Sequence, residues 1–393
     1  MKTQPIHVAM LVVDANDVRG SSMKKEALPS PVVHPAIEAL WEGLAQREDC
    51  RTDILFGRHC PASRVRPAVG SLGFHEVPYR RLGGILPGAG FLGRMRSLLH
   101  ALARIQPQLV HGQGSERESA LAAVSSPYPG VLTLHGLMGE VAAMPENRAL
   151  FHYRVAGWIE KYAVKKAKGM IAISPYALRI ILAINQRCRF IPNAVRGIFY
   201  DSAVGQRPAS LPRVLFVGNL TEVKRPDWFI QAVHLLWKRG RDFEARMLVM
   251  GDPKHSYYQK TVELAASPVG DRKIEVKPNV SEVWKEMAGA DILFAPSTWE
   301  SMGIAVCEAM AASLCVVASR IEVNIPLLGQ GCGAMFRTES FEEAVAVLER
   351  SICDPAFRRQ AVQGAKKRVM EYHPSKVAEQ TVEYYREILE GIN

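Results

Sequence analysis

DILFAPSTWESMGIAVCEAMAA, residues 291–312, is the stretch that decides the fold. It starts as a short apolar run, passes through a polar loop that contains Glu300, and continues from Gly303 as an apolar helical segment. A buried strand that leads through a glycine turn into a helix is typical of a doubly wound α/β domain. Because a helix N-terminus presents unpaired N–H groups, this segment predicts an anion site, most simply a diphosphate, at Gly303.

Glu308 lies inside this helical segment, and its neighbours Val306, Cys307, Ala309 and Met310 are all apolar. Burying a carboxylate costs free energy unless it has a partner. Two hydroxyl groups of a sugar ring would serve as that partner. We therefore predict a binding role for Glu308, with a solvated surface glutamate as the alternative.

A second segment, VGNLTEVKRP at residues 217–226, has the same strand-to-turn character. Gly218 and Asn219 form the turn, and Lys224 follows shortly after. A lysine at the mouth of a strand can neutralise a phosphate as a point charge. We predict this role for Lys224, with an ordinary surface lysine as the alternative.

Apolar runs and helical patterns alternate on both sides of these segments, which predicts parallel βαβ units in tandem. Ser174 followed by Pro175 is a helix-start signal, and the polar stretch 203–212 is typical of a linker. We expect two Rossmann-like domains, 1–205 and 206–375, and a C-terminal helix at 376–393 that packs back toward the first. Ligands of such sheets bind at the carboxyl ends of the strands, so we expect the site in a cleft between the domains. The expected strands are 6–13, 51–56, 108–110, 131–134, 170–173, 189–192, 213–217, 247–250, 291–295 and 315–318.

The composition is that of a soluble globular protein, with 48% hydrophobic and 22% charged residues. The seven cysteines are odd in number and include no CxxC pair, which argues against a disulfide framework or a zinc site. The N-terminus lacks the pattern of a signal peptide. These features predict a cytoplasmic protein that binds no metal.

Glu300 and Glu308 are separated by seven residues, and with Gly303 and the EAMA that begins at Glu308 they resemble the E-x7-E signature of retaining GT-B glycosyltransferases, particularly family 4. The resemblance implies transfer of a sugar from a nucleotide-diphosphate sugar to an acceptor hydroxyl, with retention of configuration and without a cofactor. It assigns Glu308 to the ribose, Glu300 to the donor sugar, and the backbone of Met302, Gly303 and Ile304 to the sugar–phosphate end.

Weaker matches and several departures accompany this signature. His135, in the TLHG of residues 133–136, stands where the family places a histidine near the reacting centre, with a structural histidine as the alternative. Asn219 replaces an arginine that usually binds donor phosphate, and Arg225 is a candidate to compensate. The remaining departures are Met302 for phenylalanine, Pro278 for glycine, Val323 and Asn324 for a glycine pair, Leu327 for a glutamate, and the segment 14–22 in place of another glycine pair.

Positive charge is concentrated in the first half of the chain. Residues 1–207 hold 26 Lys and Arg against 15 Asp and Glu, and no acidic residue occurs between Glu76 and Glu116. The arginines of that acid-free segment alternate with apolar residues, as in a helix that lies on an anionic membrane. The pattern predicts a peripheral contact at the inner face of the membrane and an anionic or lipid-linked acceptor, as in cell-surface polysaccharide or glycolipid synthesis. The alternative is a helix that packs its leucines into the core and leaves its arginines in water.

Three other functions stay open on the sequence. A nucleotide-sugar epimerase would also have doubly wound domains, although the E-x7-E segment disfavours it. A non-catalytic protein with a degraded donor site is suggested by Asn219 and the missing glycines. Nucleic-acid binding is suggested only by the basic half. Because no zinc knuckle, aromatic RNP-like stretch or helix-turn-helix pattern is present, we expect no nucleic-acid partner.

Overall fold

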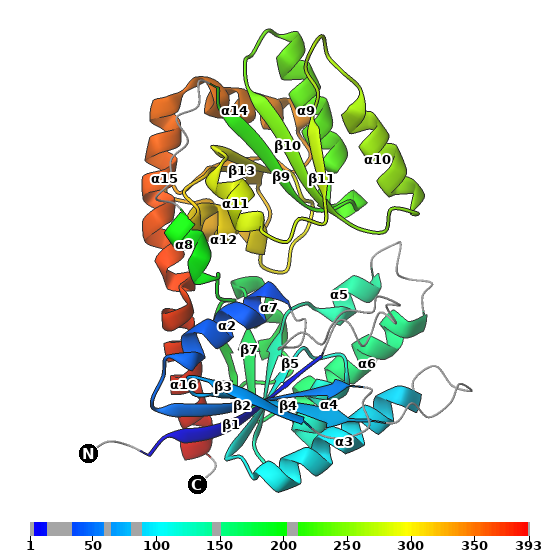
Figure 1. The fold of residues 1–393 in the computed structure, drawn as a ribbon, viewed down its shortest axis with the longest axis vertical. Helices are drawn as coiled ribbons and strands as arrows, with labels where there is room; N and C mark the ends of the chain where they lie inside the picture. The colour runs from blue at the N-terminus through cyan, green and yellow to red at the C-terminus, as the bar shows by residue number, and fades with distance from the viewer. Residues whose placement is uncertain are drawn as a thin grey trace. The chain divides into compact units, whose positions relative to one another are not determined.

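The structure is a computed structural model, and it describes residues 4–13, 34–58, 64–79, 89–143, 151–202 and 211–391. The chain forms two compact units. Unit 1 comprises Met1–Ala194 and Pro374–Asn393, and unit 2 comprises Val195–His373. The chain thus leaves unit 1, completes unit 2, and returns to unit 1 for its last helix (Figure 1).

Unit 1 is built on an eight-stranded sheet with the order β3-β4-β2-β1-β5-β6-β7-β8. All neighbouring strands are parallel except β3 and β4, which form an antiparallel pair at one edge. The strands are β1 (Ile6–Val12), β2 (Cys50–Arg58), β3 (Arg64–Val69), β4 (Leu72–Pro78), β5 (Leu109–Gln113), β6 (Gly130–Leu134), β7 (Gly169–Ala172) and β8 (Cys188–Phe190). The helices are α2 (Pro35–Ala45), α3 (Ala89–Ile105), α4 (Glu118–Ser125), α5 (Met138–Ala143), α6 (Phe151–Lys166), α7 (Pro175–Leu182) and α16 (Pro374–Glu390).

Both faces of this sheet are covered, as the alternation along β1 demonstrates. Val8 and Met10 pack into a core with α2 and α16, whereas Ala9 and Leu11 pack into a second core with α3, α4, α6 and α7. Side chains along a strand point to opposite faces in turn, so a strand that is apolar at successive positions, as β1 is from Val8 to Val12, must be buried on both faces. Helices α2 and α16 lie side by side (Figure 1).

Unit 2 contains a six-stranded parallel sheet with the order β11-β10-β9-β12-β13-β14. The strands are β9 (Arg213–Asn219), β10 (Glu244–Met250), β11 (Glu275–Pro278), β12 (Ile292–Ala295), β13 (Cys315–Ser319) and β14 (Ala334–Phe336). The helices are α8 (Gly197–Ser202), α9 (Pro226–Lys238), α10 (Ser256–Ala266), α11 (Val283–Ala288), α12 (Ile304–Ala311), α13 (Asn324–Leu328), α14 (Phe341–Cys353) and α15 (Pro355–Val369), with 3₁₀ turns η1 (Glu222–Lys224) and η2 (Met370–Tyr372). Counted along the unit, this is the 3-2-1-4-5-6 order of dinucleotide-binding folds.

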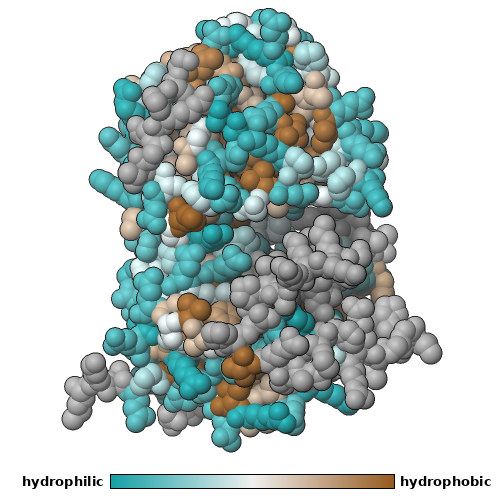
Figure 2. All heavy atoms as spheres, viewed as in Figure 1, coloured by the Kyte–Doolittle hydropathy of each residue, from teal (hydrophilic) through white to brown (hydrophobic). Residues whose placement is uncertain are grey.

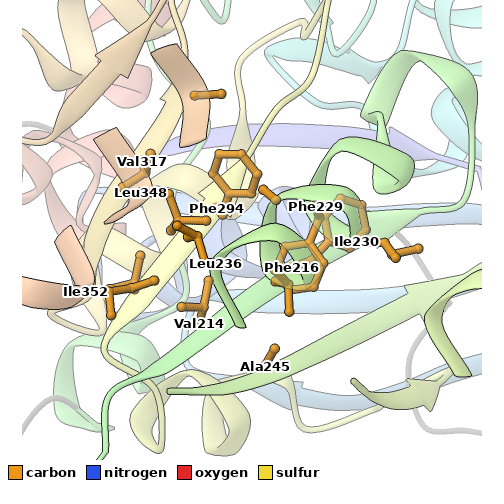
Figure 3. Packing of buried hydrophobic residues seen from close by; sticks show 14 of the residues in the cluster. Val214, Phe216, Phe229, Ile230, Leu236, Ala245, Phe294, Val317, Leu348 and Ile352 are labelled. Atoms are coloured by element: carbon orange, nitrogen blue, oxygen red, sulfur yellow. The ribbon is translucent and has the colours of Figure 1, made fainter. Parts of the chain in front are cut away.

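The core of unit 2 is aromatic at its centre. The Phe294 ring of β12 lies 6.2 Å from that of Phe229 on α9 and 5.6 Å from that of Phe336 on β14, measured between ring centroids. Figure 3 shows Phe216, Phe229 and Phe294 grouped among aliphatic side chains from the neighbouring elements. This packing fixes the ends of β9 and β12, where the predicted site residues follow.

The α/β fold with two Rossmann-like domains is confirmed, and the expected strands are found within a few residues of their predicted places. Ser174 caps α7 as its neighbour Pro175 predicted, because its Oγ accepts a hydrogen bond from the Ala177 N–H at 3.2 Å. Part of the acid-free segment forms α3, and this helix buries Leu98 and Leu102 in the core. Arg80, Arg81, the segment 14–22 and most of the expected linker lie outside the described residues.

Candidate functional site

The strand order of unit 2 indicates by itself where a ligand site is expected. The chain runs from β9 outward to β10 and β11, then returns to place β12 on the other side of β9. The loops after β9 and β12 therefore diverge from two adjacent strands, which is the switch point where open α/β sheets bind ligands. Lys224 follows β9, and Glu300 follows β12.

These two loops are joined by both backbone and side chains. The Thr298 N–H donates to the Val223 carbonyl at 2.8 Å. Beside this bond, the Lys224 ammonium forms an ion pair with the Glu300 carboxylate, and both side chains stay partly exposed. The sequence predicted one residue for phosphate and the other for sugar, but it gave no sign that they pair. The phosphate role of Lys224 and the sugar role of Glu300 stay predictions, and the ion pair shows that the two side chains lie together.

Arg225 does not stand in for the arginine that Asn219 replaces. Its guanidinium stacks over the Trp228 ring, 4.3 Å from the centroid, and donates to the Thr338 carbonyl. Asn219 itself is exposed at the end of β9, next to the buried Gly218. Lys224 is consequently the cation of this segment that lies at the switch point.

Gly303 begins α12 in the left-handed conformation, with φ of +75°, a region that glycine occupies without strain. The first N–H groups of a helix have no partner within the helix and can bind an anion. Met302 is buried before this turn and Ile304 is partly buried after it. The roles of Met302, Gly303 and Ile304 at the sugar–phosphate end stay predictions, and a left-handed turn before α12 is compatible with them.

Glu308 is buried on α12, with 8% of its surface exposed, and is not a solvated surface residue. Burial raises the pKa of its carboxyl group to about 8, and the positive charge of Arg196 opposes this rise. Arg196 lies just before α8, a helix that contacts α12. A ligand that donates hydrogen bonds to this carboxylate would stabilise its charged form.

Asn324 is a polar residue beside the glycine turn, and the sequence indicated it only as a replacement for a glycine of the family pattern. It is buried, its Nδ2 donates to the Ser319 carbonyl at 2.9 Å, and its Oδ1 accepts no hydrogen bond from the described residues. A Cβ atom placed on Gly303 would lie 3.4 Å from that Oδ1. Asn324 thus packs directly behind the glycine turn.

His135 belongs to unit 1, where it follows β6. Its Nε2 lies 2.7 Å from Oε1 of Gln113 and its ring stacks on His34, with centroids 5.8 Å apart. Burial lowers the pKa of His135 to about 3. The side chain is therefore a neutral imidazole at physiological pH, with Nε2 as the donor to Gln113.

The strand order defines a doubly wound α/β protein, and the glycine turn and the Lys224–Glu300 pair make the switch point of unit 2 a candidate anion site. Two family models match the chain: Glycosyltransferase Family 4 over residues 37–196, and Glycosyl transferases group 1 over residues 211–353. Together these matches span most of the chain. The protein belongs to the GT-B glycosyltransferases of the family 4 type, as the E-x7-E segment had indicated.

Relatives with known names include synthases of sugar phosphates. The chain is 26% identical to the alpha-maltose-1-phosphate synthase of Mycolicibacterium smegmatis over 297 residues, which covers 68% of this chain and 75% of the relative. Among solved structures it resembles the sucrose-phosphate synthase of Thermosynechococcus elongatus, with a TM-score of 0.76, 17% identity, and 99% and 100% of the two chains covered. It also resembles Anabaena HepE in complex with UDP-glucose, with a TM-score of 0.70, 15% identity, and 97% and 100% coverage. At these identities the structural likeness supports the fold.

Two further findings concern the surroundings of the site. Among the helices that the structure describes, none has both the length and the apolar character needed to cross a bilayer. Within the same residues, no group of three His, Cys, Asp or Glu side chains has the arrangement of a metal site.

Proposed function

We propose that this glycosyltransferase takes its sugar from a nucleotide-diphosphate sugar and transfers it to an acceptor hydroxyl with retention of configuration. The observation that carries the proposal is the meeting of Lys224 and Glu300 at the switch point beside the helix that begins at Gly303 and buries Glu308. The relative HepE is named as a complex with UDP-glucose, which supports this donor class.

The reaction needs stabilisation of the departing nucleoside diphosphate. Lys224 supplies a positive charge, and the first amides of α12 supply oriented dipoles. Glu300 would then leave Lys224 and face the donor sugar. Glu308, as a buried acceptor, would bind the ribose hydroxyls. None of these steps requires a metal ion, and metal independence remains a prediction.

Donor binding is the direct test of this site. We expect one of UDP, GDP and ADP to bind in calorimetric titration, and we expect Glu308→Gln to weaken that affinity. A buried hydrogen bond to a charged group contributes on the order of 1.5–3 kcal/mol, or about tenfold to a hundredfold in affinity. Glu263→Gln, on the exposed face of α10, is the matched control. Equal affinity in wild type and Glu308→Gln would remove Glu308 from the site.

Retention is a separate part of the proposal and needs its own measurement. The nuclear magnetic resonance coupling of the anomeric proton distinguishes an α-linked from a β-linked product. With an α-linked donor we expect an α-linked product as first formed. An inverted product would refute retention while leaving the donor site intact.

A second candidate function is donor binding without transfer. Asn219 at the family's arginine position and the engagement of Arg225 with Trp228 and Thr338 both favour it. Losing one charged donor would cost on the order of 1.5–3 kcal/mol of donor affinity. Incubation with several nucleotide sugars and mass detection of released nucleotide separates the two candidates, because a binding protein would release none. An epimerase would convert the nucleotide sugar without releasing the nucleotide.

The basic half of the chain is the observation behind a proposal for the acceptor and the cellular place of the reaction, and α3 contributes exposed cations to it. Arg94 on this helix pairs with the buried Glu118 at 2.8 Å and stacks on Tyr79. Arg96 and Arg104 are exposed on the same helix. We propose an acceptor that is anionic or lipid-linked, in cell-surface polysaccharide or glycolipid synthesis, used by a cytoplasmic enzyme peripheral to the membrane.

A further inference from the structure

Helix α6 exposes three aromatic side chains in one row. Phe151, Trp158 and Tyr162 are exposed by 69%, 65% and 51%. They are three of the thirteen large hydrophobic side chains that stand exposed among the described residues, and the other ten are spread over many elements. On the face of the molecule in Figure 2, apolar residues outside the grey regions also occur in small separate groups among hydrophilic ones. An aromatic row of this kind is a feature that core packing does not explain.

The spacing of the three rings confirms that they form a stripe. Successive helical residues are rotated by about 100°, so Phe151, Trp158 and Tyr162 fall within roughly 40° of one another. The buried residues of α6, Glu160, Ala163 and Val164, occupy the opposite side. The helix therefore has one face in the core of unit 1 and an aromatic face in solvent.

Positive charges border the aromatic stripe. Arg154, Lys161 and Lys165 lie along one side of it and Lys166 lies along the other, and all four are exposed. The one acidic residue of α6 is Glu160, which is buried. Its carboxylate accepts hydrogen bonds from the Ser115 hydroxyl at 2.6 Å and from the Met138 and Gly139 N–H groups at 3.1 and 3.3 Å. The solvent face of α6 thus presents rings and cations without a carboxylate.

The neighbouring helices extend this charge. Helix α4 contacts both α3 and α6 on the same side of the sheet. On α3 the exposed side chains include Arg96, His100 and Arg104. These three line a cavity of about 420 Å³ between α3 and β4. The face formed by α3, α4 and α6 therefore carries positive charge on both of its outer helices.

We propose that the aromatic stripe of α6, with the cations beside it, binds the surface of an anionic membrane. Aromatic rings insert at the boundary between headgroups and acyl chains, while Lys and Arg meet the anionic headgroups. No described helix can span a bilayer, so the contact is peripheral. None of these side chains is among the residues of the proposed donor site in unit 2, so the inference does not depend on the proposed reaction.

Vesicle sedimentation tests the surface with the full chain. Wild type is mixed with phosphatidylcholine vesicles and with vesicles of equal parts phosphatidylcholine and phosphatidylglycerol, at low and high salt. We expect binding to the anionic vesicles that weakens at high salt, because salt screens the charges. The variants are the triple F151S/W158S/Y162S and the double K161E/K165E. All five positions are exposed, so both variants are expected to fold, which circular dichroism checks.

Two control variants match these changes on α10 and its preceding loop. K254E/K260E makes the same charge change at two exposed lysines, and Leu264→Ser removes an exposed apolar side chain. Each cation near an anionic surface contributes about fivefold in affinity. We expect a loss of at least tenfold for each α6 variant and no more than about twofold for the controls. Nucleotide affinity should stay unchanged in every variant.

Three outcomes would overturn the inference. The first is binding of the α6 variants equal to that of the controls. The second is wild type that binds neither kind of vesicle but binds heparin or single-stranded DNA, which would make the surface a polyanion site. The third is wild type that ignores vesicles and forms a dimer that the triple variant abolishes, which would make the stripe an interface between copies.

Discussion

Burial of Glu308 makes ionisation of its carboxyl group unfavourable, and a ligand that donates hydrogen bonds to it can offset this effect. The folded state holds a proton on this carboxyl up to a pKa of about 8, whereas the ordinary value is 4.5. The stabilising contribution of that proton is complete below pH 4.5 and is lost as pH rises through about 8. At high pH the carboxylate is ionised, and the positive charge of Arg196 favours this ionised form.

We therefore predict that Glu308→Gln gains stability relative to wild type as pH rises. The two proteins should melt at similar temperatures at pH 5, and the variant should melt higher at pH 9. Differential scanning calorimetry across this range measures the difference. Glu263→Gln should show no such divergence. Parallel pH profiles for wild type and Glu308→Gln would mean that Glu308 is ionised throughout.

Lys224 and Arg225 are adjacent in sequence but have different partners, which predicts different consequences of their loss. Lys224→Ala should weaken nucleotide affinity by about tenfold to a hundredfold with little change in stability. Arg225→Ala should leave nucleotide affinity within about twofold, and should lower stability by roughly 1 kcal/mol or more through loss of the Trp228 stack and the bond to Thr338. Titration and thermal melting of both variants decide the matter. The reverse assignment would make Arg225 the phosphate cation.

At the scale of single residues, the sequence predicted the positions that form a linear pattern. Glu300, Gly303 and Glu308 lie within one segment, so their spacing could be interpreted directly. Arg196 was missed because Glu308 is distant from it in sequence, and Asn324 was interpreted only as a lost glycine because Gly303, which it packs behind, belongs to another segment. Nothing near Arg196 in the chain indicates that its charge acts on Glu308 more than a hundred positions later.

At the scale of an element, the N-terminus of α12 depends on one conformation. Gly303→Ala would force an alanine to φ of +75° and place its Cβ against Asn324. We expect a loss of stability of roughly 1–2 kcal/mol and a clear loss of nucleotide affinity. Gly240→Ala is the matched control, because Gly240 has the same φ and no heavy atom near the added Cβ. It should lose similar stability and keep its nucleotide affinity. Unchanged affinity in Gly303→Ala would exclude this turn from the site.

The sequence predicted helices and strands correctly where their apolar residues recur with the regular spacing of a helix or a buried strand. The runs that became β1 and β9 are apolar and β-branched, as buried parallel strands must be. The antiparallel edge pair β3 and β4 was not predicted, since Arg64–Val69 and Leu72–Pro78 mix charged, polar and apolar residues. The arginines of α3 suggested a membrane helix, whereas the aromatic stripe of α6 went unnoticed because the exposure of Trp158 depends on which side of α6 the core covers.

At the scale of the whole molecule, the last helix is part of the first unit. Val377, Val382 and Tyr385 of α16 are buried in the core that contains β1 and α2. The Tyr385 hydroxyl lies 2.6 Å from Nδ1 of His111, which is fully buried in β5. Removing that hydroxyl leaves a buried ring nitrogen without its partner.

Tyr385→Phe should accordingly lower the stability of unit 1 by about 1–3 kcal/mol. Thermal melting followed by circular dichroism measures the loss, and Tyr162→Phe, on the exposed face of α6, should change nothing. Truncation after His373 should do far more, because it uncovers the apolar face of α2. A truncated chain that stays monomeric and melts as wild type does would contradict this role of α16.

The return of the chain to unit 1 also orders events on the ribosome. Unit 2 is synthesised without interruption, so it can fold while translation continues. The nascent first unit lacks α16 until all of unit 2, Val195–His373, has been synthesised, and until then α2 covers that face of the sheet without its neighbour. During that interval the apolar surface that α16 later covers is a natural substrate for chaperones, and synthesis of α16 is the step that completes the core of unit 1.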